Sequence, residues 1–438
     1  MKVGIDVRDM SSILGFIKGT VGGIDLSIEI NSRIVTEVVS RLAIAAHIEG
    51  RDDVRDEAIK LLRSIHEYVM SKGSRYSRVY SLVMLANALA RTDHTDEVRE
   101  LMSNINELVE GLEGLSGVTA LADIAEVMYK CGLVRYGRNL LLKGESLARG
   151  LDDLEERVWG LSYVSLVASL TRELPIALRT IKEAIKTAKA LGKALSGRLV
   201  EELSNAIAEL CKAGAVDEAA EVSRELISLI SSFADMEHYL PVLEALGSVE
   251  LVSKDRVREV LNALLANAEE SIPKNTGNPA FEVSMKLFHY ITIARVAAKV
   301  GLINYSLNLL TLLKEVIRDM EVVGSGDAEA LSTMVIPIIP HLPVIAEVVG
   351  SKGLIKEAEE VLSMALNVAN KASTESYIAR VIGPEVIEAS KGLTYIGIVR
   401  AAGKLGMYEL VHKALSKVGE VGVALMAISS LLAAKYGL

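Results

Sequence analysis

The feature that most constrains the fold is a regular spacing of glycines. Gly50, Gly132 and Gly214 stand 82 residues apart, or two units of 41, and each ends a segment with apolar positions at helical spacing. Turns near Asp93 and Arg172 fall where the intermediate units should end. A fixed period of this length predicts a repeat protein in which each unit packs on its neighbours.

The period lengthens in the second half of the chain, where Gly301, Gly353 and Gly406 are separated by 52 and 53 residues. We expect about nine antiparallel helix pairs over residues 31–418, and an apolar helix over residues 419–438. Because a solenoid grows through local contacts, 438 residues need no boundary between globular domains.

Small residues flank three of the turns, seven positions before the glycine and five after it. The three sets are Ala125, Gly132 and Gly137; Ala294, Gly301 and Ser306; and Ala346, Gly353 and Ala358. This pattern resembles the tetratricopeptide repeat, in which small residues let the two helices of a unit approach closely. The resemblance implies an all-α, right-handed solenoid whose first helices line a concave groove. The unit is longer than the family's, of about 34 residues, so HEAT-like packing is the structural alternative.

Residues 1–30 differ from the rest of the chain. Apolar residues alternate with polar ones or glycine over Val3–Val7 and again over Ile24–Ile30, which is strand periodicity. Glycines between them, including Gly15 and Gly19, suit a flexible connection. We predict a small two-stranded β element that caps the array, with strand addition to a partner as the alternative.

The last helix is unusual for a terminal cap, because Lys435 is its only charged side chain between Val421 and Leu438. Terminal repeats normally have a polar outer face. Either this helix packs into the last pair, or a second subunit covers it. A homodimer through this helix or through the N-terminal strands is therefore one expectation.

Composition limits the partners and the compartment. The formal net charge of -9 opposes broad contact with nucleic-acid phosphates or anionic lipid. Cys131 and Cys211 have no CxxC partner, and glutamine is absent, which is a trend of thermophile proteins. We expect a cytoplasmic, archaeal-like protein of a thermophile. The apolar stretch Met334–Val349 contains three prolines, which predicts a kinked core helix rather than a membrane span.

Two acidic clusters are the strongest enzyme-like signal, Asp52–Asp56 and Asp152–Glu156. The first resembles the DDxxD sequence of isoprenoid synthases, whose carboxylates hold magnesium and diphosphate. Both clusters follow a turn and open a helix, where acidic residues satisfy free amides and complement the helix dipole. The seven histidines have no metal-ligand spacing. We expect helix starts here, with no metal, no cofactor and no catalytic residue.

The function predicted from these observations is a protein-interaction scaffold that binds a peptide or partner protein in its groove. An all-helical enzyme of isoprenoid-synthase type and an RNA-binding helical repeat are the alternatives. The alignment with the tetratricopeptide family places ten residues in the groove: Arg41, Asn87, Arg91, Glu126, Tyr129, Lys130, Asn205, Lys212, Arg295 and Lys299. Cations recur near the ends of first helices, which predicts an acidic ligand; compensation of helix dipoles is the alternative explanation.

Overall fold

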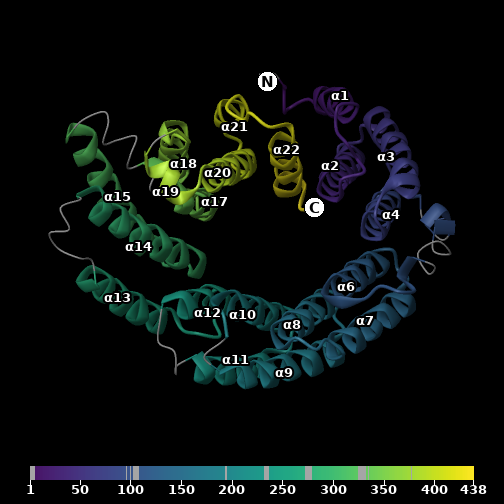
Figure 1. Cartoon of the computed structure of the whole chain (residues 1–438), viewed down its shortest axis with the longest axis horizontal. Helices are drawn as coiled ribbons and strands as arrows, with labels where there is room; N and C mark the ends of the chain where they lie inside the picture. The colour runs from purple at the N-terminus through teal and green to yellow at the C-terminus, as the bar shows by residue number, and fades with distance from the viewer. Residues whose placement is uncertain are drawn as a thin grey trace. The chain divides into compact units, whose positions relative to one another are not determined.

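The computed structural model describes residues 5–94, 96–98, 100–101, 108–192, 195–230, 236–271, 279–323, 332–333, 335–375 and 377–438. The regular structure within these ranges is helical, and they contain no β-strand (Figure 1). Within the same ranges, no helix combines the length and the apolar character that crossing a bilayer requires.

The contacts divide the chain into two compact units. The central unit, Ile24–Ser253, contains α2 (Glu29–Ile48), α3 (Asp52–Lys72), α4 (Arg75–Ala90), α6 (Gly114–Lys130), α7 (Val134–Arg149), α8 (Leu154–Leu170), α9 (Leu174–Leu191), α10 (Gly197–Lys212), α11 (Val216–Ile230) and α12 (Met236–Ser248). 

The terminal unit joins Met1–Gly23 to Lys254–Leu438. Its helices are α1 (Met10–Val21), α13 (Lys254–Ser271), α14 (Pro279–Val300), α15 (Ile303–Val323), α17 (His341–Ser351), α18 (Ile355–Lys371), α19 (Tyr377–Ile382), α20 (Pro384–Lys404), α21 (Tyr408–Leu415) and α22 (Val421–Tyr436), with the 3₁₀ turn η2 (Ile336–Ile338).

Each unit is built from helix pairs that repeat along the chain. In the central unit α2 packs on α3, α6 on α7, α8 on α9 and α10 on α11, while α2, α4, α6, α8, α10 and α12 pack on one another in that order. In the terminal unit α14 pairs with α15, α17 with α18 and α20 with α21, and α14, α17, α20 and α22 form the corresponding row. We call the members of these rows first helices. The chain is therefore an all-helical repeat fold.

The turns after the first helices share one backbone geometry. A residue with positive φ ends each of these helices, as at Gly132, Arg172 and Gly406, where φ is 73°, 60° and 75°. In most of these turns the next N–H then donates to the carbonyl five residues back, for example from Glu173 to Ala168 at 2.7 Å. This arrangement satisfies carbonyls that the helix end leaves free. The turns predicted near Asp93 and Arg172 are confirmed, because both residues have positive φ.

The small residues around the turns lie where the two helices of a pair cross. The Ser306 hydroxyl donates to the Ala294 carbonyl at 2.8 Å, and a Cβ on Gly137 would lie 3.0 Å from the Ala125 carbonyl oxygen. Ala346 and Ala358 are both fully buried. The close approach that the spacing predicts is thus seen at Gly137 and at Ser306, and the two alanines lie in the buried core.

The predicted N-terminal β element is wrong. Val3 lies outside the described residues; residues 5–9 form a turn, α1 follows, and α2 has already begun at Glu29. Gly15 and Gly19 lie within α1, and a Cβ added to either would meet no atom within 4 Å. Met10, Ile13 and Ile17 form the buried face of this helix. Alternation of apolar and polar residues over only five to seven positions does not distinguish a strand from a loop or from the start of a helix. The local chemistry favours the loop and the helix start, since Asp9 caps α1 through the amides of Ser11 and Ser12.

The apolar C-terminal helix packs within its own chain. α22 lies against α20, and the contact is so close that a Cβ on Gly403 would collide with the Leu431 side chain. The N-terminal segment belongs to the same unit, where the Arg8 guanidinium stands 4.9 Å from the centre of the Tyr408 ring. The helix thus packs into the last pair, as one of the two expected arrangements requires.

Candidate functional site: a cavity and a polar row on the first helices

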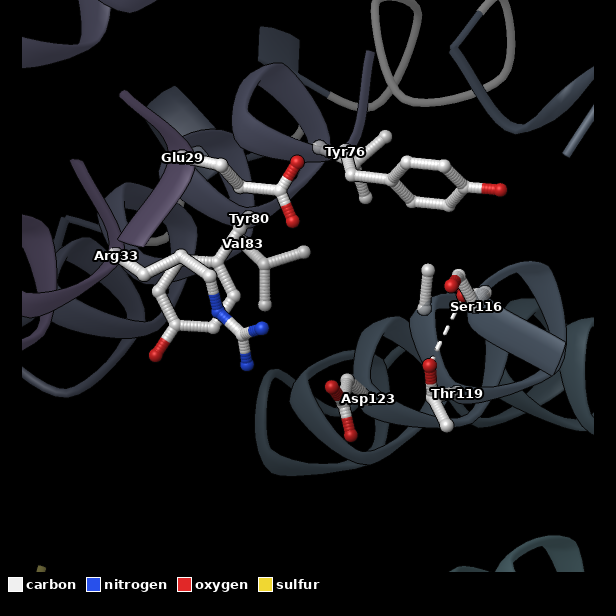
Figure 2. A pocket seen from close by; sticks show the side chains of 10 residues that line it. Glu29, Arg33, Tyr76, Tyr80, Val83, Ser116, Thr119 and Asp123 are labelled. Atoms are coloured by element: carbon white, nitrogen blue, oxygen red, sulfur yellow. Dashed lines mark hydrogen bonds between the residues drawn. The ribbon is translucent and has the colours of Figure 1, made fainter. Parts of the chain in front are cut away.

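A small cavity lies between α2, α4 and α6 in the central unit (Figure 2). Its volume is about 100 Å³, which exceeds the space needed for a single water molecule. The lining comes from the first halves of three consecutive first helices: Glu29, Arg33, Tyr76, Val79, Tyr80, Val83, Ser116, Thr119, Ala120 and Asp123. The repeat fold therefore positions all of its charged groups, because adjacent first helices pack side by side.

One wall combines a cation with an aromatic ring. The Arg33 guanidinium from α2 stands 4.8 Å from the centre of the Tyr80 ring on α4, which is cation–π geometry. The Tyr80 hydroxyl donates to Glu37 Oε2 at 3.1 Å. Burial, and then the negative charge of Glu37, raise the pKa of Tyr80, so this hydroxyl stays protonated at neutral pH and keeps donating.

The opposite wall carries a partly buried carboxylate. The Tyr163 hydroxyl on α8 donates to Asp123 Oδ1 at 2.6 Å, and the Tyr163 ring stacks on Trp159 with centroids 5.2 Å apart. Burial raises the pKa of Asp123 to about 6, although the hydrogen bond from Tyr163 opposes the rise. Asp123 is therefore mostly ionised at neutral pH, but its charge is poorly compensated.

These hydrogen bonds form a row across four helices. Glu37 on α2 accepts from Tyr80 on α4, and Asp123 on α6 accepts from Tyr163 on α8. The separations are 43 residues in the first pair and 40 in the second, so the row follows the repeat period. Glu202 on α10 lies near the end of it, since burial and, among other causes, the negative charge of Glu202 raise the pKa of Tyr163. We call Glu37, Tyr80, Asp123 and Tyr163 the acid–tyrosine row.

Hydrogen bonds hold the rim of the cavity in place. The Tyr76 hydroxyl donates to the Glu113 carbonyl at 3.0 Å, and the Ser74 hydroxyl donates to Glu29 Oε2 at 2.9 Å. Within α6 the Thr119 hydroxyl donates to the Ser116 carbonyl at 2.9 Å (Figure 2). The opening is thus formed by fixed side chains, which is the preorganisation that a binding site requires.

The structure places several of the sequence-predicted groove residues on the same face as the row. Arg41 lies two turns after Arg33 on α2, and Glu126 and Lys130 follow Asp123 on α6, where the half-exposed positions continue. Each predicted cation on these helices is close to an acid of its own helix. Arg41 pairs with Glu37 at 2.8 Å, and Lys130 pairs with Glu126 at 2.7 Å. 

On α10 Lys212 pairs with Glu209 at 2.5 Å, and Asn205 is exposed on the same helix. These intrahelical pairs favour the dipole and ion-pair explanation of the recurring cations over an acidic ligand. Arg91 caps the end of α4, and Asn87 keeps a buried Oδ1 without a hydrogen-bond partner in the described part of the chain.

The remaining predicted residues lie apart from the cavity. Tyr129 donates its hydroxyl to Glu173 at 2.7 Å, and its ring packs against Gly137 at the start of α7. Arg295 and Lys299 belong to α14 in the terminal unit, where the Arg295 guanidinium meets His341 at 3.0 Å. Arg295 thus contacts α17, the next first helix of its own row.

Sequence reasoning missed the cavity residues themselves. The available signal was the spacing of Glu37, Tyr80 and Asp123, whose two steps are both 43 residues, close to the repeat period. The turn glycines align the repeats at the C-terminal ends of the first helices, so several predicted groove residues, such as Lys130 and Lys212, lie in the last turns of these helices. The cavity instead lies at their first halves.

The acidic clusters have local roles. Asp153 caps α8 by accepting from the Glu156 amide at 2.9 Å, and Asp52 and Asp53 lie in the first turn of α3, where Arg51 and Arg55 contact them. The hydrogen bond from Arg51 lowers the pKa of Asp53. Among the described residues, no three or more His, Cys, Asp or Glu side chains are placed to hold a metal ion.

No protein-family profile matches the chain, and no curated protein sequence matches it. Among solved structures, it is similar to a protein described as a circular tandem repeat protein with novel repeat topology and enhanced subunit contact surfaces. The two are 16% identical over 93% of this chain and 98% of the other, with a TM-score of 0.25. The helical-repeat fold therefore rests on the order and packing of the helices described above.

Proposed function

We propose that this chain is a scaffold that binds a peptide or a segment of a partner protein along the first helices of its central unit. The acid–tyrosine row beside the cavity supports the proposal, because its polar and aromatic groups come from four successive first helices, α2, α4, α6 and α8, and lie on one face of them. Tyrosine, tryptophan and arginine are the side chains that most often anchor protein interfaces. Here the polar groups hold and orient a partner rather than catalyse a reaction.

We also propose that the helix pairs form a solenoid of the tetratricopeptide type. The small residues at the helix crossings support the tetratricopeptide type and its right-handed superhelix, and the spacing of the turns supports a solenoid of about nine pairs. A single peptide running across several first helices would contact residues one repeat apart. Affinity would then be spread over a few anchors in the row.

The test is selection of peptides from a random library on the full-length protein, followed by measurement of their Kd by fluorescence anisotropy. Arg33→Glu combined with Asn205→Arg changes two exposed positions on the first-helix face. We expect this double variant to bind the selected peptides at least about tenfold more weakly, because a charged contact contributes roughly 1.5–3 kcal/mol.

The matched control makes the same net charge change at exposed positions on second helices, Lys60→Glu on α3 and Ser228→Arg on α11. Its affinity for the same peptides should equal that of the parent. Equal weakening by the two double variants would show a general charge effect. A first-helix variant that binds like the parent would refute the proposed surface.

A further inference from the structure

Two opposite charges face the cavity from different walls and do not pair with each other. Figure 2 shows the Arg33 guanidinium and the Asp123 carboxylate both directed into the space between α2, α4 and α6. Neither forms an ion pair within the described part of the chain. A group that fills the gap must therefore accept hydrogen bonds from Arg33 and donate them to Asp123.

The lining also has an excess of negative charge. Glu29 and Asp123 are carboxylates, and Arg33 is the one cation among the lining residues. Asp123 accepts from Tyr163 through Oδ1, which leaves Oδ2 available as an acceptor, and Glu29 accepts from Ser74 through Oε2. The ligand group that fits is thus positively charged and carries a carbonyl oxygen beside its charge.

We propose that this cavity binds the free N-terminus of a peptide, with the α-ammonium at Asp123 and Glu29 and the first carbonyl oxygen at Arg33. This deepens the proposed function and rests on it. The backbone of an internal peptide segment has no ammonium, and a lysine side chain has no carbonyl beside its ammonium to meet Arg33. A cavity of about 100 Å³ also accepts one small residue rather than a continuous chain. The Tyr76 ring, which has no cation over it in the described part of the chain, adds a cation–π surface for the ammonium.

Binding of this kind has a defined pH window. Asp123 must be ionised and the ligand amine must be protonated. The pKa of Asp123 is raised by burial to about 6, and that of an α-amine is about 8. Affinity should therefore be greatest between about pH 6 and pH 8 and should fall on both sides.

The probe is L-alaninamide, which carries the ammonium and the carbonyl and little else. N-acetyl-L-alaninamide lacks the charge, and L-alanine replaces the amide by a carboxylate. Trp159 is the only tryptophan of the chain and stacks on Tyr163, so its fluorescence reports on the Asp123 hydrogen bond. We expect saturable binding of L-alaninamide and none of the acetylated compound in titrations of the full-length protein at pH 7.

Two variants separate this site from general electrostatics. Asp123→Asn should weaken L-alaninamide binding at least about tenfold, because it removes the charged acceptor. Glu155→Gln, at an exposed position in the first turn of α8 and outside the cavity lining, should bind like the parent. Isothermal calorimetry gives the Kd for both variants, so quenching of the fluorophore does not affect the comparison.

The outcomes distinguish the alternatives. If neither L-alaninamide nor L-alanine binds, the assignment of an N-terminal site is overturned, whereas library peptides that still bind the first-helix face keep the broader proposal. Tighter binding of L-alanine than of L-alaninamide would identify a free amino acid as the ligand and would overturn the peptide terminus. Equal binding of the acetylated compound would also refute the ammonium site.

Discussion

At the scale of single residues, the repeat depends on a backbone conformation more than on a residue type. Glycine ends most first helices, but Asp93, Arg172 and Glu250 occupy the same left-handed position with φ values of 66°, 60° and 61°. A left-handed conformation costs an ordinary L-residue about 1–2 kcal/mol. These three turns therefore retain strain that glycine would release, and the surrounding helix pair imposes it.

Arg172→Gly should stabilise the protein by about 0.5–1 kcal/mol, because glycine adopts this φ without a Cβ clash, while its greater freedom in the unfolded chain offsets part of the gain. Arg172 is exposed. Gly132→Ala is the reciprocal change and should be destabilising, because alanine is strained at a φ of 73°. The added Cβ would meet no atom within 4 Å, so the loss would come from the backbone conformation alone. Chemical denaturation measures both, and a less stable Arg172→Gly would contradict this account.

Asp123 gives the stability of the protein a predictable pH dependence. Its folded-state pKa, about 6, lies above the ordinary value of 3.8, so the folded state retains a proton that the unfolded state has lost between these values. Stability from this group is therefore full below pH 4 and is lost as pH rises to about 6. Asp123→Asn should be more stable than the parent at pH 7.5, by roughly 1–3 kcal/mol.

The same comparison at pH 3.5 serves as the internal control, because the parent carboxyl is then protonated in the folded state and mostly protonated in the unfolded state. The two proteins should unfold at similar denaturant concentrations there. A constant difference at both pH values would show that the substitution acts through packing. A less stable variant at pH 7.5 would show that Asp123 is compensated better than its surroundings indicate.

At the scale of helices, the close crossings decide which positions accept a larger side chain. Helix α7 contains two buried glycines in different surroundings. A Cβ on Gly137 would lie 2.7 Å from the Tyr129 ring and 3.0 Å from a backbone oxygen, whereas one on Gly144 would have ordinary contacts of 3.6 Å or more. The intrinsic helix propensity of alanine favours both substitutions by about 1 kcal/mol.

Gly137→Ala should therefore destabilise the protein by about 1–3 kcal/mol, because the added methyl overpacks the crossing of α6 and α7. Gly144→Ala should be neutral or stabilising, and it controls for helix propensity in the same helix. Thermal unfolding of the two variants beside the parent measures the difference. Equal effects would show that the α6–α7 crossing has more room than the backbone positions indicate.

The elements differ in how well the sequence predicts them. The helix pairs were predictable from the sequence because glycines such as Gly132 and Gly301 end the first helices with positive φ. The small residues that flank these glycines mark where the two helices of a pair cross. Glu250 gave no such signal, since only the packed repeat imposes its conformation. The cavity was not predictable, because it depends on which turns of α2, α4 and α6 come into register.

At the scale of the whole molecule, the chain is organised as two compact units, and the N-terminal segment belongs to the unit that contains the C-terminus. Sequence order alone predicts that the N-terminal segment belongs to the central unit, since in a solenoid each segment normally contacts its neighbours along the chain. The terminal unit thus combines residues from both ends of the sequence, and α1 provides it with a buried stripe that includes Ile13 and Ile17.

Ile17→Ala should test this organisation, since its side chain is fully buried and its truncation removes about 2–4 kcal/mol of packing. Because α1 belongs to the terminal unit, amide hydrogen exchange should accelerate in α20, α21 and α22 and stay unchanged in α6 to α10. Ile30→Ala, at a position that is 59% exposed on α2, is the control and should leave both units unaffected. Faster exchange confined to the central unit would instead show that the N-terminal segment stabilises the helices that follow it in sequence, and would refute its assignment to the terminal unit.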